Sequence, residues 1–455
     1  MLPRVLLPLL MATGCTPSTF DGAEVYPFEV TLALAEEIPT VVVASWSTDL
    51  EGITRAWVAF GPTEELGHEA AVDLSAEPPD EAILVGSKGE AEVHVRVFAE
   101  TAEGTFVSEE QLITTGPVPA YLPNLSVTHR AAGHWDGYLV TGFVADEVSV
   151  ILDEDGDVVW WHEAQGGGDG PQTGVVLLGR TLLARDGRAV LYGFNNIDGD
   201  EDTAIRRVSL DGAEDVAIDA PFSHHDFVDL PDGTIAYLAY NPRVVEDSEQ
   251  FGDSIVEIAP DGRRRIVWDV WDYYDYVRDG LPGPGASWPH GNAIDYIEEE
   301  DAYLVGFLTL GVIILVDRVS GEPIWTLGGP RAELVPADDV DMATHHQFDL
   351  VSDHLVVFDN GGIDIGATSR AWEVALDLEA GVAEKVWEYA PEPALNCTNL
   401  GDVDRLENGN TLVTFSVSGQ IHEVTPAGQV VWRLEAAAGG ALSYAQRVDA
   451  IGPNE

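Results

Sequence analysis

The sequence predicts an all-β protein: a small β-sandwich of the fibronectin III or immunoglobulin kind, followed by a six-bladed β-propeller. A turn-and-tryptophan motif recurs about every 50 residues, which is typical of radially repeated β-architectures. Two-strand patterns precede the copies of this motif. No segment of useful length competes with the 3.6-residue period of a helix. The 455 residues exceed one ordinary domain, although a propeller absorbs most of them.

The recurring motif is a short apolar run, an Asp/Gly turn, a few strand formers and a tryptophan. A weaker sixth copy, SLDGAEDVAI (Ser209–Ile218), falls in the widest gap. We expect the five tryptophans to pack between blades. The five clear copies are LDEDGDVVWW (Leu152–Trp161), APDGRRRIVW (Ala259–Trp268), DRVSGEPIW (Asp317–Trp325), LDLEAGVAEKVW (Leu376–Trp387) and TPAGQVVW (Thr425–Trp432). The tryptophans concerned are Trp160, Trp268, Trp325, Trp387 and Trp432.

A second pattern, strand, turn and strand, lies ahead of the tryptophan motif. Together the two patterns give four strands per blade, and counting from Leu152 gives six blades. Blades converge on a central channel, so functional residues are expected at the inner strands. The four hairpins are Asp226–Tyr240, Ala293–Phe307, Phe348–Gly361 and Asp402–Ser416.

The N-terminal end resembles a bacterial lipoprotein signal. Residues 1–14 supply Arg4, a short apolar stretch and small residues before Cys15. The resemblance implies cleavage before Cys15, lipidation of that residue and anchoring in the cell envelope. Thr16 in the next position suggests the outer membrane. A plain secretory signal with an incidental cysteine is the alternative.

The remaining chain divides into three predicted parts. Residues 15–26 form a tether, residues 27–118 the β-sandwich and residues 119–455 the propeller. Once Cys15 carries lipid, Cys397 is the only remaining thiol. No intrachain disulfide is then possible.

The charge balance excludes some partners. Aspartate and glutamate number 79 against 22 lysines and arginines, for a net charge of −57. This argues against nucleic acids and against direct binding to an anionic membrane, since both need clustered basic groups. The acidic run Asp153–Asp157 resembles part of a calcium loop, but turn chemistry explains it better. No metal and no cofactor are predicted.

Histidines stand ahead of three successive hairpins. Alignment of the hairpins puts His224 opposite His290, and the pair His345 and His346 falls within two residues of the same level. Three blades thus present imidazoles to one end of the channel. The hairpin alignment favours His224 over its neighbour His225. Adjacent strand residues point to opposite faces, so only one of them should reach the channel, and the sequence leaves open which one.

Imidazoles gathered in this way suit either metal binding or nucleophilic transfer. No carboxylate or cysteine completes a familiar metal set, which favours transfer. A neutral imidazole would attack an electrophilic sulfur or phosphorus centre. The other histidines and an amide such as Asn292 would donate hydrogen bonds to the oxygens and the leaving group.

The region from about Leu122 to Leu434 resembles the bacterial arylsulfate sulfotransferase family, which are six-bladed enzymes. The most specific matches have the patterns W-x-H-x-N and F-D-N-G. The matching stretches are SHHDFVDLPDG (Ser223–Gly233), SWPHGNAIDY (Ser287–Tyr296), SGEPIWTLGG (Ser320–Gly329), HHQFDL with VVFDNGG (His345–Gly362), SRAWEVALDL (Ser369–Leu378), KVWEY (Lys385–Tyr389), DRLENGNTLV and HEVTPAGQVVW.

The resemblance implies transfer of a sulfuryl group from an aryl sulfate to a phenol through a sulfohistidine. His346 corresponds to the nucleophile. His290 and Asn292 correspond to residues that contact the sulfuryl oxygens and the leaving phenolate. His224 or His225 corresponds to a further imidazole. Phenols and aryl sulfates are therefore the predicted small-molecule partners.

The chain departs from the family pattern on the strand after the H-x-N motif. The family carries an arginine there, whereas this chain has Leu308 and Thr309, and no arginine before Arg318. Thr309, His345 and Arg370 are the candidate substrate-binding residues, with Arg370 the possible replacement for the missing guanidinium. A non-catalytic propeller lipoprotein with a binding or structural role is the main alternative, and a quinoprotein-type dehydrogenase a further one.

Overall fold

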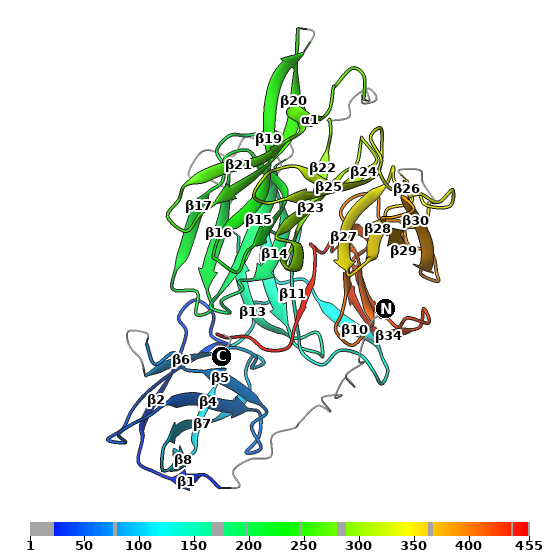
Figure 1. The fold of residues 1–455 in the computed structure, drawn as a ribbon. Coiled ribbons are helices and arrows are strands. Elements are labelled where there is room, and N and C mark those ends of the chain that lie inside the picture. The colour runs from blue at the N-terminus through cyan, green and yellow to red at the C-terminus, as the bar shows by residue number, and fades with distance from the viewer. Residues whose placement is uncertain are drawn as a thin grey trace, which may run out of the picture.

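The protein is built of β-sheets throughout, as predicted, in two parts joined near residue 120 (Figure 1). The computed structural model describes residues 22–75, 80–164, 176–196, 199–245, 247–279, 288–362, 367–437 and 440–453. The predicted signal peptide, Cys15 and the start of the predicted tether lie outside the described residues. The larger part has the propeller-like arrangement that the repeats predict.

The smaller, N-terminal part contains two sheets that pack face to face. Alternating apolar residues from both sheets, among them Val42, Trp46, Phe60 and Val95, form one buried core. One sheet has the order β1 (Glu24–Val25), β8 (Gly104–Val107), β7 (Glu92–Thr101), β4 (Arg55–Gly61) and β5 (His68–Ala71), with β9 (Gln111–Thr114) also paired to β7. The other is β2 (Glu29–Leu34), β3 (Val42–Ser47) and β6 (Glu81–Leu84).

Within the described residues, the larger part forms six sheets of four or five strands. Four of them are continuous in sequence, as the hairpin and tryptophan patterns predict. The first is β14 (Val176–Leu183), β15 (Ala189–Asn196), β16 (Ala204–Ser209) and β17 (Asp215–Asp219), and the second is β18 (Ser223–Asp229), β19 (Ile235–Val245), β20 (Ser248–Ile258) and β21 (Arg264–Asp269). The third is β22 (Gly291–Ile297), β23 (Ala302–Phe307), β24 (Val312–Asp317) and β25 (Pro323–Gly328). The fourth is β27 (His345–Val351), β28 (His354–Asp359), β29 (Arg370–Asp377) and β30 (Val382–Tyr389), with β26 (Val335–Pro336) paired to β30.

The other two sheets close the ring with strands from both ends of the larger part. β10 (Leu125–Arg130) pairs with β34 (Val430–Ala436), outside β33 (Gln420–Val424), β32 (Thr411–Phe415) and β31 (Asp402–Arg405). β35 (Gln446–Val448) pairs with β11 (Tyr138–Phe143), followed by β12 (Val148–Leu152) and β13 (Val158–Glu163). Such closure removes two exposed strand edges and ties the chain ends together.

The repeated tryptophans are core residues in four of the five copies. Trp160, Trp268, Trp325 and Trp432 are buried, as predicted. Trp387 is only half-buried, although it lies on the more buried side of strand β30 with Ala383 and Tyr389 and packs against the core cluster that contains Tyr389. The guanidinium of Arg405 lies over the Trp387 ring, 5.6 Å from the centroid.

The two parts of the protein meet at the acidic turn that resembles a calcium loop. The ammonium of Lys88, from the N-terminal part, lies 2.6 Å from Asp157, 2.7 Å from Asp155 and 3.3 Å from Asp153. A lysine of the neighbouring part therefore occupies the place that a cation would take in such a loop.

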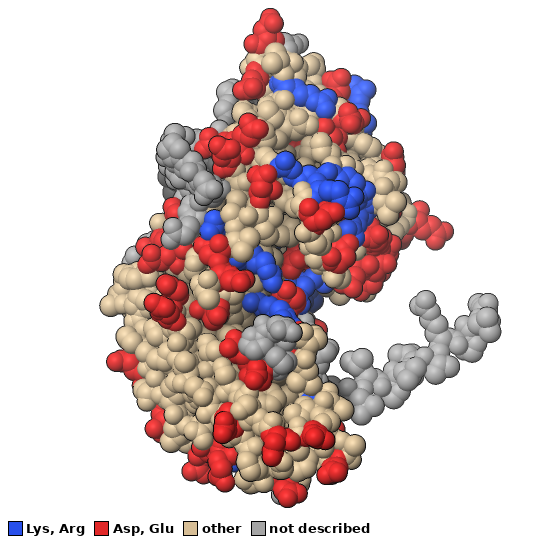
Figure 2. All heavy atoms as spheres, turned by 90° about the vertical axis from the view of Figure 1, so that its left-hand side faces the viewer, with Lys and Arg blue, Asp and Glu red and all other residues tan. Residues whose placement is uncertain are grey.

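Helical structure is limited to one four-residue α-helix, α1 (Val270–Tyr273), and the 3-10 turns Glu298–Glu300 and Ser416–Ser418 in the described residues. None of the helices there is long and apolar enough to cross a membrane. Acidic side chains are scattered over both parts of the surface, with basic groups in smaller areas between them (Figure 2).

Candidate functional site

Three neighbouring inner strands, β18, β22 and β27, carry the histidines at or just before their first residues. These strands contact one another in the order β18, β22, β27. Each has a break in its pairing register at that end, at Ser223/Phe227, Gly291/Ala293 and His345/Phe348. Bulges of this kind bend a strand and redirect its side chains.

His225 and His290 meet at this end of the strands. Their ring centroids are 5.1 Å apart. Both residues have left-handed backbone conformations, with φ of 54° and 63°. This region is costly for non-glycine residues and is found mostly where surrounding structure imposes it, often at functional sites.

His224 packs against Tyr240 and Asp253, whereas the ring in contact with His290 is that of His225. The His224 ring stacks on Tyr240 at 3.9 Å, and its Nε2 lies 3.1 Å from the buried carboxylate of Asp253. The Nδ1 atoms of His224 and His225 are 2.8 Å apart, so one ring donates to the other. The alignment that favoured His224 assumed regular alternation, which the bulge and the positive φ of His225 interrupt.

His346 is buried, with 6% of its surface exposed. Its Nδ1 is hydrogen-bonded to Oδ1 of Asn360. Its Nε2 accepts a hydrogen bond of 3.1 Å from the backbone N–H of Leu400. Both ring nitrogens therefore have partners, and a ligand that bonds to Nε2 must displace the Leu400 N–H.

The histidines of this cluster are held neutral. Burial lowers the pKa of His346 to about 3 and that of His345 to about 4. Burial, together with His224, His290 and His346, lowers the pKa of His225 well below 6.5. Burial also lowers the pKa of His290, while the carboxylate of Asp253 and a hydrogen bond with Asn292 oppose the shift. A neutral imidazole keeps the lone pair that a nucleophile needs.

Geometry brings the rings of three strands together. His225 is in ring contact with His290, and the neighbouring strand β27 carries His346 to the same end. The pKa shifts agree, since His225 is affected by His290 and His346, and His346 by His290. The structure thus brings His225, His290 and His346 into one cluster, whose catalytic roles stay predictions.

Asn292 and His345 are placed behind the cluster. The Asn292 side chain is fully buried, and its amide nitrogen donates to the backbone oxygen of His345 over 3.1 Å. His345 is also fully buried, with Nδ1 2.8 Å from the carbonyl oxygen of Met342. A Cβ on Gly306 would lie 2.9 Å from Nε2 of His345, so the ring packs against the next sheet. These positions favour support of the cluster over contact with a substrate.

Arg370, the possible replacement for the missing arginine, and Thr309, the other candidate substrate-binding residue, have different surroundings. Arg370 donates through Nε to the buried carboxylate of Asp359 over 2.8 Å. Thr309 lies close to the cluster, with its backbone N–H 3.1 Å from the carbonyl oxygen of Pro289. Nothing in these contacts places the Arg370 guanidinium among the histidines.

A different arginine, Arg180, contacts a residue that directly follows one of the histidines. Arg180, on β14, donates through Nε and Nη2 to the two oxygens of Asp226 over 2.5 and 3.3 Å. The amide of Gln347 donates to the same carboxylate over 2.8 Å. Asp226 and Gln347 directly follow His225 and His346, so this layer supports two members of the cluster.

Farther along the same strands the channel widens into a cavity of ≈400 Å³. Inner strands of all six sheets line it, and four of its carboxylates come from three of them: Asp295, Asp349, Asp402 and Asp404. Burial raises the pKa of Asp295 to about 7 and that of Asp402 to about 6. Burial, then repulsion from Asp402 and Asp349, raises the pKa of Asp404 well above its usual range. None of the histidines of the cluster lines this cavity.

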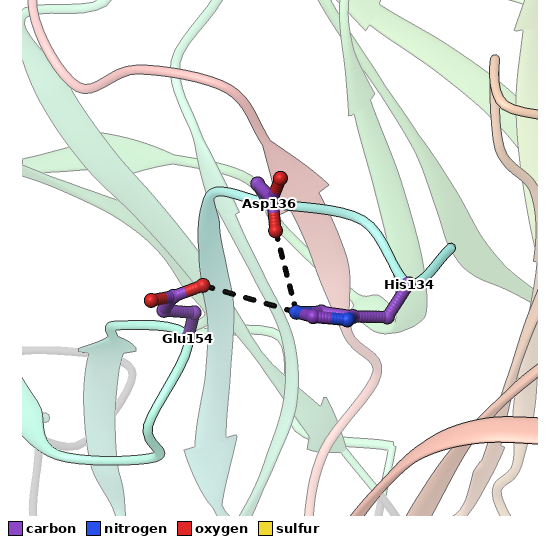
Figure 3. Close-up of side chains that lie close together, drawn as sticks. All are labelled: His134, Asp136 and Glu154. Atoms are coloured by element: carbon purple, nitrogen blue, oxygen red, sulfur yellow. Dashed lines mark ion pairs between the residues drawn. The ribbon is translucent and has the colours of Figure 1, made fainter. Parts of the chain in front are cut away.

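Two other clusters contain the side-chain types that bind metals. In one, Asp153, Asp155 and Asp157 surround Lys88, as described above. In the other, Nε2 of His134 lies 3.3 Å from Asp136 and 3.8 Å from Glu154 (Figure 3). The second group is an ion pair when His134 is protonated, and its carboxylates are 85% and 45% exposed. Neither group touches the histidine cluster.

Sequence analysis gave no role to Asn360, Leu400 or Arg180. Asn360 belongs to the F-D-N-G match, so the sequence indicated that this asparagine matters but not that it binds His346. Arg180 stands inside the apolar strand Val176–Leu183, and a charge in such a strand is itself a signal. Leu400 acts through its backbone N–H, which no side-chain pattern reveals.

Comparisons with solved structures give only distant likenesses. A protein of unknown function from Bacteroides caccae has a TM-score of 0.44 at 14% identity, covering 68% of this chain and 98% of that chain. An auxiliary nutrient binding protein from Bacteroides thetaiotaomicron has 0.37 at 9%, covering 90% and 88%. A catalytically inactive virginiamycin B lyase from Staphylococcus aureus with quinupristin has 0.39 at 10%, covering 90% and 99%.

No curated protein matches the sequence. A family model does: Arylsulfotransferase (ASST) matches residues 127–431, more than half of the chain. The matched region contains His225, His290, His346 and the residues that support them. The chain belongs to the arylsulfotransferase (ASST) family.

Proposed function

We propose that this protein moves a sulfuryl group from a phenolic sulfate ester to a phenol, with His346 as the nucleophile. The family membership supports an activity of this type. The observation that carries the assignment to His346 is its neutral ring beside two further imidazoles, on three neighbouring inner strands.

In the first half-reaction the Nε2 lone pair of His346 forms a bond to sulfur. The bond between sulfur and the phenolic oxygen breaks, and its electron pair leaves on that oxygen as a phenolate. N–H groups of His225 and His290 are suited to hydrogen-bond the phenolate and the sulfuryl oxygens. In the second half-reaction an acceptor phenol gives its proton to a neutral imidazole, its oxygen bonds to sulfur, and the N–S bond breaks.

We further propose that the six sheets are six propeller blades and that the N-terminal sheets form a fibronectin III-like sandwich. Face-to-face packing of two sheets supports the second assignment. The signal-like N-terminal end supports export with lipid on Cys15, in the cell envelope. Incorporation of labelled fatty acid that Cys15→Ser abolishes is the corresponding test.

A non-catalytic binding protein is the second candidate. The ion pairs of two arginines favour this candidate, because the guanidinium of Arg370 is paired with Asp359 and that of Arg180 with Asp226. Neither guanidinium is then free to stabilise the extra negative charge of a sulfuryl transition state. Loss of one such donor typically costs about 10²–10³-fold in rate.

The direct test is turnover of a chromogenic aryl sulfate with a phenol acceptor, by the wild-type protein and two variants. His346→Ala should lower kcat on the order of 10³-fold or more. His354→Ala is the matched control, because His354 lies on the same hairpin, pairs with Glu373 and is 42% exposed. It should keep wild-type activity. Turnover that survives His346→Ala contradicts the mechanism, and no turnover with any donor favours the binding protein.

A further inference from the structure

Asn360, which directly follows strand β28, is fixed in one amide orientation. Its Nδ2 donates to the backbone oxygens of Cys397 and Leu400 over 2.6 and 2.9 Å. Carbonyl oxygens only accept hydrogen bonds, so the atom facing them must be the NH₂ group. The amide oxygen of Asn360 is therefore the atom that faces His346.

This orientation assigns the tautomer of the His346 ring. An amide oxygen can only accept, so Nδ1 of His346 must carry the hydrogen. The backbone N–H of Leu400 can only donate, so Nε2, at 3.1 Å, must carry the lone pair. Two partners from different segments give the same answer.

We propose that Asn360 is a positioning residue that fixes the nucleophilic lone pair of His346 on Nε2, and that the Leu400 N–H caps this lone pair until substrate replaces it. This inference rests on the proposed function for the identity of the nucleophile. The tautomer itself does not depend on it.

Asn360 has a second effect as the reaction proceeds. When Nε2 bonds to sulfur, the ring becomes positively charged while Nδ1 keeps its hydrogen. The hydrogen bond to the Asn360 oxygen then has a charged donor, and such bonds are stronger than neutral ones. Asn360 thus stabilises the charge that develops on the ring.

The surroundings of Asn360 make it rigid. It is 4% exposed. The hydroxyl of Ser369 donates to its backbone oxygen over 2.9 Å and accepts from the backbone N–H of Cys397 over 2.7 Å. These bonds tie the segment before β31 to the β28–β29 connection, across two sheets. The Leu400 N–H is held in front of His346 by the same set of bonds.

The tautomer is tested by the ¹⁵N NMR spectrum of the full-length protein labelled in its histidine rings, without substrate. His346→Ala assigns the His346 signals by their loss. The expected result is a protonated Nδ1 and an unprotonated Nε2 through the neutral pH range. A protonated Nε2 with an unprotonated Nδ1 overturns the inference, whether or not the protein turns over aryl sulfates.

The positioning role is tested by the kinetics of Asn360→Ala and Asn360→Asp. Asn360→Ala should lower kcat about 10²-fold with a smaller change in the KM of the donor. Asn360→Asp keeps an acceptor for Nδ1–H, loses the two hydrogen bonds to the backbone oxygens of Cys397 and Leu400, and adds a charge that favours the imidazolium. It should restore part of kcat and move the acid limb of the pH profile upward. The other titratable groups around His346 are the imidazoles of His225, His290 and His345, which neither variant alters.

The matched control is Asn410→Ala. Asn410 is also a buried asparagine, with its amide nitrogen bonded to Gly133 and Glu423, away from the histidines. It should lose stability but keep the wild-type pH profile. A pH profile in Asn360→Asp that matches wild type contradicts the positioning role. If Asn360→Ala does not fold, Asn360→Asp and the wild-type spectrum still decide.

Discussion

Burial holds the histidines of the cluster in their neutral form. The same burial makes them a source of pH-dependent stability. Unfolded, each histidine has a pKa near 6.5, whereas folded His346 has a pKa of about 3. Between these values the unfolded chain binds the additional proton, so stability from this group rises with pH and is lost as the pH falls.

A comparison of wild type with His346→Gln isolates this effect. On lowering the pH from 7 to 4, wild type should lose on the order of 2–3 kcal/mol of unfolding free energy relative to the variant. The raised pKa values of Asp295 and Asp402 act in the opposite sense, but they are common to both proteins and cancel in the difference. Denaturant unfolding at several pH values measures this difference in the free energy of unfolding. The prediction is contradicted if the free energies of the two proteins change with pH in parallel.

At the residue scale, the sequence was sufficient to find the histidines but not to orient them. Alignment of the hairpin sequences predicted that His290 and His346 lie at the same end of the inner strands. It could not show that a bulge and a left-handed backbone turn His225, rather than His224, toward His290. The partner of His346 at Nε2 lies 54 residues away, in the connection between β30 and β31, and such contacts follow from the closed ring rather than from local pattern.

At the scale of elements, one of only two lysines adds a polar contact to the apolar core that the two parts share. Lys88 pairs with three carboxylates of the turn between β12 and β13. Lys88→Met keeps most of the apolar stem but leaves those carboxylates to repel one another. Because Lys88 is 44% exposed, solvent screens the interaction and the effect is modest.

We expect Lys88→Met to lower the midpoint of thermal unfolding by roughly 1–3 °C at low salt, and by less at high salt. The other lysine supplies the control, because the partners of Lys385, Asp339 and Glu388, belong to a single part of the protein. Scanning calorimetry compares the midpoints of thermal unfolding of Lys88→Met and Lys385→Met. An equal or larger shift in Lys385→Met would show that the Lys88 contact is not special.

For the whole molecule, repetition in the sequence was the strongest predictor. Spaced turn and tryptophan motifs predicted the all-β fold and most strands of the larger part, and four tryptophans are buried as expected. Trp387 differs in being only half-buried, packed against a core cluster and covered by the guanidinium of Arg405. Closure by β10 and β35 joins segments more than 300 residues apart, so no local pattern could reveal it.

The two ends of the channel carry different side chains. Imidazoles gather where β18, β22 and β27 begin. The cavity farther along the channel is lined by seven carboxylates and by four arginines, Arg180, Arg185, Arg405 and Arg447. We place the reaction at the histidine end because the neutral imidazoles lie there.

The central claim is that sulfur is transferred through Nε2 of His346. The most direct measurement is mass mapping of the full-length protein after brief incubation with a chromogenic aryl sulfate and no acceptor. The account predicts one sulfuryl group on the peptide that contains His346, lost when a phenol is added. A sulfuryl group on any other residue, or phenol release with no covalent adduct in rapidly quenched samples, would contradict it.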